Sequence, residues 1–332
     1  MSDVALDIST GLSIPLTTFA LTFEQKGAIA DLIAPKKPVV LRSSPFPVWD
    51  KKSLYHSGSA LVGPRGEIPE IKESLGSATY SVLDYGQRVV SPIDAEAEFA
   101  ALGINKEQRD TKKIMNYLAL EREARARLLF MTTGNYAVTA GPAAGTWDLA
   151  ASTPLQDFAT AIRTIIGMSM RKVVVMGRAV WDVLRFNTQV LSALGRPGGQ
   201  TNREIASASQ DDIAMMLGVD AVLVGDLQFN NANDATTMSR SFIWSDKHVA
   251  VVVAPLEQDL VGDTLAFAIT FRLIRQQLAE QDFGGLPATA VIRRWFEQRD
   301  GLMGSWHTVG GYSEDIKLCS SDAGYLITNV IP

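Results

Sequence analysis

Histidines and carboxylates are the side chains of this chain that could carry out acid–base or metal chemistry, and their spacing predicts no convergent site. The three histidines, His56, His248 and His307, lie in different regions and share no helix face. An active site needs a nucleophile with its base, a pair of carboxylates or a set of metal ligands brought together. We therefore expect no catalytic, cofactor-binding or metal-binding residues.

The densest group of carboxylates is formed by Asp211, Asp212, Asp220 and Asp226. Asp211 and Asp212 come just before an apolar run, where we interpret them as the first turn of a helix over residues 210–217. Negative charge at that position is favourable by about 0.3–1 kcal/mol. The group is thus explained without catalysis, and a soluble α/β enzyme is kept only as an alternative of a different class.

Basic residues flank several apolar segments, at Arg163, Arg171, Lys172 and Arg178. A phosphate site would need a glycine-rich loop beside them, and neither a Gly-x-Gly-x-x-Gly nor a Gly-Lys-Ser/Thr motif accompanies them. These residues are more typical of solvated element ends.

Composition describes an ordinary globular protein, with 332 residues, 46% of them hydrophobic and 20% charged. No apolar run reaches the length of a membrane-spanning helix, and the start lacks the layout of a signal peptide, so we expect the protein to be made and kept in cytoplasm. The net charge of -5 argues against a dedicated nucleic-acid binder. The single cysteine, Cys319, is expected to be a buried thiol.

The most sharply punctuated stretch is residues 217–255, which we expect to lie in the middle of a mixed sheet. Residues 219–229 and 240–253 are rich in apolar and β-branched side chains, and the turn formers of residues 230–234 separate them. The two runs predict one long hairpin-like unit.

Asn105 is expected to cap the clearest helix of the chain, which ends before Gly134 and spans roughly 40 Å at 1.5 Å per residue. Two i,i+4 pairs, Glu121 with Arg125 and Glu123 with Arg127, are placed on its solvated side. The predicted apolar stripe consists of Ile114, Tyr117, Leu118, Ala124, Leu128 and Met131.

The rest of the chain predicts layered helices and strands behind a proline-rich, extended start. We expect one short helix over residues 21–34, and a β-rich pair of runs over residues 50–90 around Gly63-Pro64-Arg65-Gly66. The order helix, strand, helix, strand that follows is typical of an α/β domain. Its expected elements are a helix over residues 154–168 capped by Thr153, a strand over 172–176, a helix over 178–194, a glycine-rich loop at 195–199 and the helix 210–217. After Pro255 we expect a strand over 265–274, a strand or short helix over 290–298, and closing strands that return to the region of the long helix.

Several blocks resemble the core of tailed-phage major capsid proteins when they are taken in order. The blocks are Leu217-Gly218-Val219, Val224-Gly225-Asp226, Phe242-Ile243-Trp244, His248-Val249 and Pro255, followed by the closing run Ser321-Asp322-Ala323-Gly324-Tyr325-Leu326-Ile327. The resemblance covers most of the chain from about residue 50 onward.

This resemblance implies an α+β fold of the Hong Kong 97 type, with an N-terminal arm, an extended β-hairpin loop, a peripheral domain that contains a long spine helix, and an axial α/β domain. The expected boundaries are residues 1–49 for the arm, 50–92 for the loop, 93–152 for the peripheral domain, completed by parts of the C-terminal third, 153–305 for the axial domain and 306–332 for the closing strands. In a ring of such subunits, the loop at residues 195–199 is expected to lie near the symmetry axis.

The function that the resemblance implies is a self-assembling shell protein of a virion, assembled in the host cytoplasm around double-stranded DNA and without enzymatic activity. Its partners would be other copies in hexamers and pentamers, a scaffolding protein, a portal, a decoration protein, and DNA touched non-specifically on the inner face; no membrane is involved. A gene-transfer particle or an encapsulin-like nanocompartment shell is the alternative. The residues expected to contact a neighbouring subunit are Trp49, Arg65, Glu67, Glu70, Lys72 and Tyr85, and deleting residues 57–85 is expected to leave a soluble fold that forms no shells.

Overall fold

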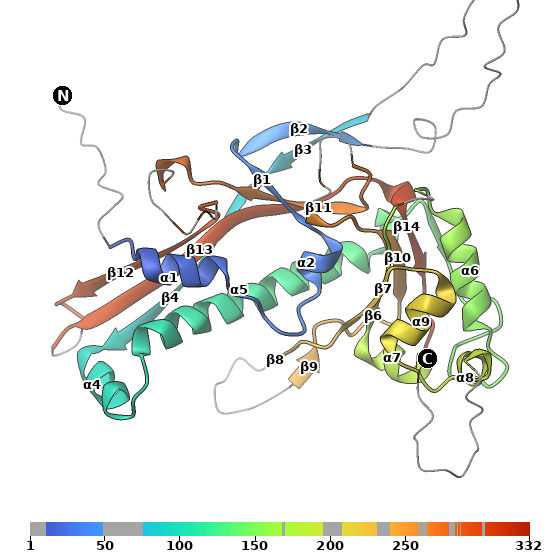
Figure 1. The fold of residues 1–332 in the computed structure, drawn as a ribbon, viewed down its shortest axis with the longest axis horizontal. Helices are drawn as coiled ribbons and strands as arrows, with labels where there is room; N and C mark the ends of the chain where they lie inside the picture. The colour runs from blue at the N-terminus through green and yellow to red at the C-terminus, as the bar shows by residue number, and fades with distance from the viewer. Residues whose placement is uncertain are drawn as a thin grey trace, which may run out of the picture.

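The computed structural model has an elongated shape, with a long sheet and one long helix toward one end and a compact α/β layer at the other (Figure 1). It describes residues 11–48, 76–167, 170–194, 208–230, 240–257, 260, 264–278, 283, 285, 287–300 and 303–332. No helix within these ranges is both long enough and apolar enough to cross a membrane. The expected mixture of helices with two larger sheets, an α+β fold, is confirmed.

Helix α5 (Lys106–Phe130) is the longest helix, and it begins where the sequence predicts. The Asn105 side chain accepts a hydrogen bond from the Gln108 backbone N–H at 3.1 Å, which satisfies one of the donors that a helix start leaves unpaired. Ile114 and Leu118 are buried as predicted, but Tyr117 and Leu128 are 54% and 61% exposed. Those two lie on the exposed face, because the buried face includes the charged residues Arg122 and Glu123 in their place. The buried residues of α5 are Asp110, Thr111, Ile114, Met115, Leu118, Arg122, Glu123, Ala126 and Phe130.

A five-stranded sheet lies along α5, and β13 is its longest strand. Its strands are β1 (Lys36–Val39), β11 (Ala268–Leu273), β13 (Ser305–Leu318), β12 (Ala290–Glu297) and β4 (Leu83–Pro92). β13 pairs antiparallel with β4, β11 and β12. A Cβ at Gly310 would lie 2.9 Å from Ile114 Cγ2 and 2.5 Å from Ile292 Cδ1, so this glycine lets the helix approach the strand closely. The expected return of the last third to the long helix is confirmed.

The segment before residue 40 crosses the helix and the sheet. It contains α1 (Ile14–Leu21), the single turn α2 (Ala30–Ile33) and β1, which pairs parallel with β11. The predicted helix over residues 21–34 is therefore wrong except for its last turn, α2. Gly27 has φ +82° in the middle of that range, a left-handed conformation that ends a helix, and Pro15 instead opens α1 in the first turn, where proline is well tolerated.

A two-stranded ribbon of β2 (Ser43–Val48) and β3 (Gly76–Ser81) projects from this sheet (Figure 1). Its base is fixed by Tyr80, which stacks on Phe271 with ring centroids 4.3 Å apart, and by Phe46, 5.0 Å from the same ring. The predicted tip around residues 63–66 lies outside the described residues. Because Tyr80 and Val82 are buried in the core, deletion of residues 57–85 would remove packing that the fold needs, and the smaller segment 49–75 is the one to test.

The second sheet has the strand order β5, β14, β10, β6, β7 and mixes parallel with antiparallel pairs. The strands are β5 (Val138–Ala140), β14 (Gly324–Ile327), β10 (Val249–Val253), β6 (Lys172–Gly177) and β7 (Ala221–Gly225). Of the stretch 217–255, which was predicted to lie mid-sheet as one long hairpin, β10 is the central strand but β7 is an edge strand, and the single hairpin is wrong. β7 pairs parallel with β6 and β10 pairs antiparallel with β6, so the strand from residues 172–177 separates them. In the described part of this stretch, the ribbon is limited to the short β8 (Gln228–Asn230) and β9 (Arg240–Phe242).

Four short helices surround this second sheet: α6 (Pro154–Thr164), α7 (Arg178–Leu184), α8 (Thr188–Ala193) and α9 (Gln210–Leu217). α9 has the predicted bounds and a complete capping box between Ser209 and Asp212. The predicted helix 178–194 is broken at Asn187. Its amide donates to the Trp147 carbonyl at 2.9 Å and its oxygen caps α8 by accepting from Gln189 N at 2.9 Å, hydrogen bonds that an uninterrupted helix would not allow.

The remaining elements are small. Thr153 precedes α6 as predicted, but its side chain makes no capping hydrogen bond. Residues 290–297 form strand β12 and not a helix, and the glycine-rich loop at 195–199 lies outside the described residues. The other short elements are α4 (Ile93–Ala101), η1 (Thr133–Asn135), η3 (Gln276–Leu278) and η4 (Ser321–Ala323).

Candidate functional site

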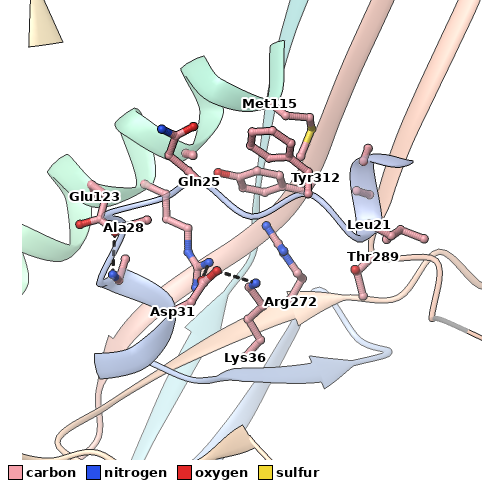
Figure 2. Close-up of a pocket in the computed structure, with 16 residues that line it drawn as sticks. Leu21, Gln25, Ala28, Asp31, Lys36, Met115, Glu123, Arg272, Thr289 and Tyr312 are labelled. Carbon is pink, nitrogen blue, oxygen red and sulfur yellow. Dashed lines mark hydrogen bonds and ion pairs between the residues drawn. The ribbon is translucent and has the colours of Figure 1, made fainter. Parts of the chain in front are cut away.

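The most unusual group of side chains lies where the N-terminal segment, α5 and the first sheet meet. A cavity of about 70 Å³ opens there, lined by residues that include Asp31, Lys36, Arg122, Arg272 and Tyr312 (Figure 2). The sequence supplies these residues from positions nearly 300 apart, and the parallel pairing of β1 with β11 brings them together. The charges at this junction decide what the site can do.

Glu314 on β13 is the centre of the group and has no exposed side-chain surface. Arg125 Nη2 lies 2.9 Å from its Oε1, Arg272 Nη2 lies 3.2 Å from its Oε2 and Arg122 Nε lies 3.5 Å from its Oε1. Burial alone would raise the pKa of Glu314, but the guanidinium groups of Arg122, Arg272 and Arg125 outweigh it and hold that pKa below its ordinary value. Glu314 is therefore ionised at neutral pH. Its carboxylate binds the guanidinium groups of Arg122 and Arg125 from α5 and of Arg272 from β11.

Arg122 extends the group to the N-terminal segment. Its guanidinium pairs with the Asp31 carboxylate, and its Nη2 donates to Thr270 Oγ1 at 3.2 Å. Thr270 Oγ1 in turn donates to the Ala34 carbonyl at 2.9 Å. Lys36 Nζ also reaches Asp31, at 2.8 Å (Figure 2). Burial, followed by repulsion from Arg272, lowers the pKa of Lys36 to about 8.

Glu123 ties the same segment to the second sheet. It accepts a hydrogen bond from the Ala30 backbone N–H at 2.6 Å and one from Trp244 Nε1 at 2.7 Å. Burial raises the pKa of this carboxyl, while these two donors oppose the increase. Trp244 itself fits because Gly225 lies against its ring: a Cβ there would be 2.2 Å from Trp244 Cγ. The predicted surface pair of Glu123 with Arg127 is wrong, since Glu123 is buried and Arg127 instead pairs with Asp246 at 2.5 Å.

Chemically, the junction is suited to holding segments together, because its ion pairs join residues of different elements. The arrangement links the segment of residues 30–36 to α5, to the first sheet through β11 and β13, and to the second sheet through Trp244. The predicted pair of Glu121 with Arg125 is wrong for the same reason, because Arg125 turns inward to Glu314.

Of the residues that the sequence singled out for chemistry, His248, His307 and Asp226 each have a partner of their own, and His56 lies outside the described residues. His248 Nδ1 accepts from the Asn329 backbone N–H at 3.0 Å, and His307 Nε2 lies 2.5 Å from Asp300 Oδ2. Asp226 contacts Arg178 at 3.5 Å. Asp211 and Asp212 occupy the first turn of α9 as predicted. Within the described ranges, no three His, Cys, Asp or Glu side chains are grouped in a way that could hold a metal ion. Cys319 is buried, which raises the pKa of its thiol to about 12.

Of the predicted inter-subunit contacts, only Tyr85 is described. It lies half-buried on β4 beside Tyr312, with ring centroids 6.2 Å apart and the Arg125 guanidinium 3.7 Å from its ring centroid. Its role between subunits stays a prediction. The other predicted contacts, Trp49, Arg65, Glu67, Glu70 and Lys72, lie outside the described residues.

Sequence reasoning missed the Glu314 group. The signal available was the run from Glu121 to Arg127, which contains five charged residues. Five charges in seven residues cannot all lie on the solvated face of one helix, so some of them must point toward the core. Glu314 and Arg272 gave no local signal. Glu314 stands beside Asp315 and near Lys317, as an exposed residue would, and Arg272 is one charged residue near the end of an apolar run.

Comparison with known proteins places the fold. No family model matches the chain. The chain is 25% identical to the major capsid protein of Pseudomonas phage JBD67 over 232 aligned residues. The alignment covers 69% of this chain and 73% of that protein. It superposes on a phage-related protein from Bordetella bronchiseptica with a TM-score of 0.71 at 17% identity, covering 97% of this chain and 99% of the other.

A second solved structure, the capsid of cyanophage P-SCSP1u, matches with a TM-score of 0.56 at 10% identity over 92% of this chain and 89% of the other. At such identities the structural matches establish the fold, which is of the Hong Kong 97 capsid type. The expected resemblance to tailed-phage major capsid proteins is confirmed.

Proposed function

We propose that this chain is the major capsid protein of a tailed phage, which assembles into the icosahedral shell around packaged double-stranded DNA. The observation that carries the proposal is that a capsid fold accounts for nearly the whole chain and not for one inserted domain. We propose that the role is structural and without enzymatic activity.

The surface of the subunit supports association with other copies. Large apolar side chains remain exposed at several places, among them Leu41, Leu83, Leu102, Leu128, Met215 and Met303. Such side chains gain from burial by about 25 cal/mol per Å² of apolar surface removed from water. Many modest contacts of this kind close a shell when symmetry repeats them.

The parts of the chain take on distinct roles in this proposal. Residues 1–49 act as the arm, 50–92 as the extended loop, 93–152 with parts of the last third as the peripheral domain, 153–305 as the axial domain and 306–332 as the closing strands. The ribbon of β2 and β3 supports the loop assignment, because β3 lies within residues 50–92 and pairs with β2 at the end of the arm, and a two-stranded ribbon has too little core to stand alone.

The partners follow from the same role. The chain pairs with itself in hexamers and pentamers, and it meets a scaffolding protein, a portal and a decoration protein during assembly in the host cytoplasm. The product is a virion component.

Replacing residues 49–75 with Asn-Gly tests the loop and the function together. Val48 and Gly76 are paired residues of β2 and β3, so a two-residue turn can join them directly, and Asn-Gly suits that turn. We expect a soluble protein with the unfolding midpoint of the wild type that forms no shells by electron microscopy. Shells of normal size from this variant would contradict the loop assignment.

The wild-type particles supply the second readout. Nuclease-resistant double-stranded DNA inside particles from infected or induced cells supports a phage head. Particles that hold only protein would contradict the proposed function and favour a nanocompartment shell.

A further inference from the structure

The solvent-exposed face of the first half of α5 is basic, although the chain as a whole carries a net charge of -5. Arg109, Lys112 and Lys113 are all exposed there. At 100° per residue they fall within an arc of about 100°, on the side opposite the buried residues Thr111, Ile114 and Leu118. The three cations therefore point outward together, and we refer to Arg109, Lys112 and Lys113 as the basic face.

The acidic residues of the same helix segment do not neutralise the basic face. Glu107 pairs with Arg294, and Asp110 is buried, where it pairs with Lys106 and accepts from Ser91 at 2.7 Å. No ion pair to Arg109, Lys112 or Lys113 is found among the described residues. Arg109 instead lies over the Phe99 ring of α4, 4.5 Å from its centroid.

That stacking orients the guanidinium without using its charge. A guanidinium held against an aromatic ring keeps its N–H donors at the edge, where they remain available to an anion. Tyr117, 54% exposed, lies one turn beyond Lys113 and adds a hydroxyl near the same face. Arginine, lysine and tyrosine are the side chains that commonly contact the phosphate backbone.

We propose that the basic face of α5 contacts the phosphate backbone of the packaged double-stranded DNA. The inference rests on the proposed capsid function and deepens it, since it identifies which surface of the subunit lines the inside of the shell. Charge complementarity carries it: three aligned, unneutralised cations on a rigid helix match a regular line of phosphates, while the rest of an acidic subunit repels the same polymer. The contact is sequence-independent, because helix side chains on phosphates read no bases.

The test measures binding of the unassembled chain to a short DNA duplex by fluorescence anisotropy, between about 50 mM and about 200 mM salt. Each phosphate contact contributes a slope of about -0.9 to log K against log salt. The variant R109Q/K112Q/K113Q removes three such contacts, so we expect its slope to be smaller in magnitude by about 2.7 and its binding at the lower salt to be much weaker.

A control variant with the same loss of charge separates the face from net charge. K26Q/R88Q/R163Q removes three exposed cations from the segment before α2, from β4 and from α6, and we expect its slope to equal that of the wild type. Equal slopes for R109Q/K112Q/K113Q and the wild type, or equal losses in both variants, would overturn the inference.

Electron microscopy of the same variants distinguishes failure of the inference from failure of the proposed function. We expect R109Q/K112Q/K113Q to form shells of normal size. If that variant loses shells while its DNA binding is unchanged, the basic face is a contact between copies and the inference is wrong. If the wild type itself forms no shells under any condition, the capsid function fails, whatever the DNA slopes are.

Discussion

Replacing Glu314 with glutamine should destabilise the subunit more than any other single change of one charge. Glu314 is fully buried and lies within 3.5 Å of three guanidinium groups. Glutamine keeps the size of the side chain but removes the charge, and Arg122 and Arg272, whose side chains are only 6% and 12% exposed, would lose their main counter-ion. Breaking a buried ion pair by removing one partner costs about 3–5 kcal/mol.

The assay is urea unfolding of the unassembled chain, followed by circular dichroism and tryptophan fluorescence. The matched control is Asp182→Asn, which removes a carboxylate from an exposed pair with Arg178 at 3.1 Å. Exposed pairs contribute about 0.2–1 kcal/mol, so the control should differ little from the wild type. We expect Glu314→Gln to lower the free energy of unfolding by about 3–5 kcal/mol. A loss below about 1 kcal/mol, similar to that of the control, would refute the view that Glu314 holds the junction together.

Three further predictions concern the same core and the second sheet. The pKa of Glu314 is held below its ordinary value in the folded state. The ionised carboxylate therefore stabilises the fold at any pH above the pKa of the unfolded chain, and this stabilisation is lost as the pH falls through the lower pKa of the folded state. Unfolding free energies measured at decreasing pH should show this loss in the wild type but not in Glu314→Gln. Trp244→Phe removes the Nε1 donor that lies 2.7 Å from Glu123 and should cost about 1–3 kcal/mol in urea unfolding, whereas a neutral effect would show that Glu123 finds another donor. Gly177→Ala would place a Cβ 2.1 Å from the Trp244 carbonyl oxygen, so we expect a clear drop in the thermal midpoint, and an unchanged midpoint would mean that the backbone at Trp244 can move away from β6 at little cost.

Local signals in the sequence predicted the elements whose ends are set by nearby residues. Asn105 at the start of α5, the capping box of Ser209 with Asp212 and the strand that begins at Lys172 all appear where expected. Each of these depends on hydrogen bonds or apolar runs within a few residues, which the sequence displays directly.

Long-range pairing was beyond these signals. β7 and β10 look like the two arms of a hairpin in the sequence, but both pair with β6. Residues 173–176 of β6 are apolar and fully buried, which suits a strand with a neighbour on each side. The i,i+4 rule placed Glu123 and Arg125 on the solvated side, while the structure uses both as buried links to other elements. The contacts of Glu314 join residues that no local pattern relates.

The central claim is tested most directly by electron microscopy and sedimentation velocity of the purified chain over a range of concentrations, with and without a scaffolding protein. We expect closed shells, or rings and tubes of capsomer size, that grow with concentration. A species that stays strictly monomeric at high concentration, with and without the scaffold, would contradict the capsid function.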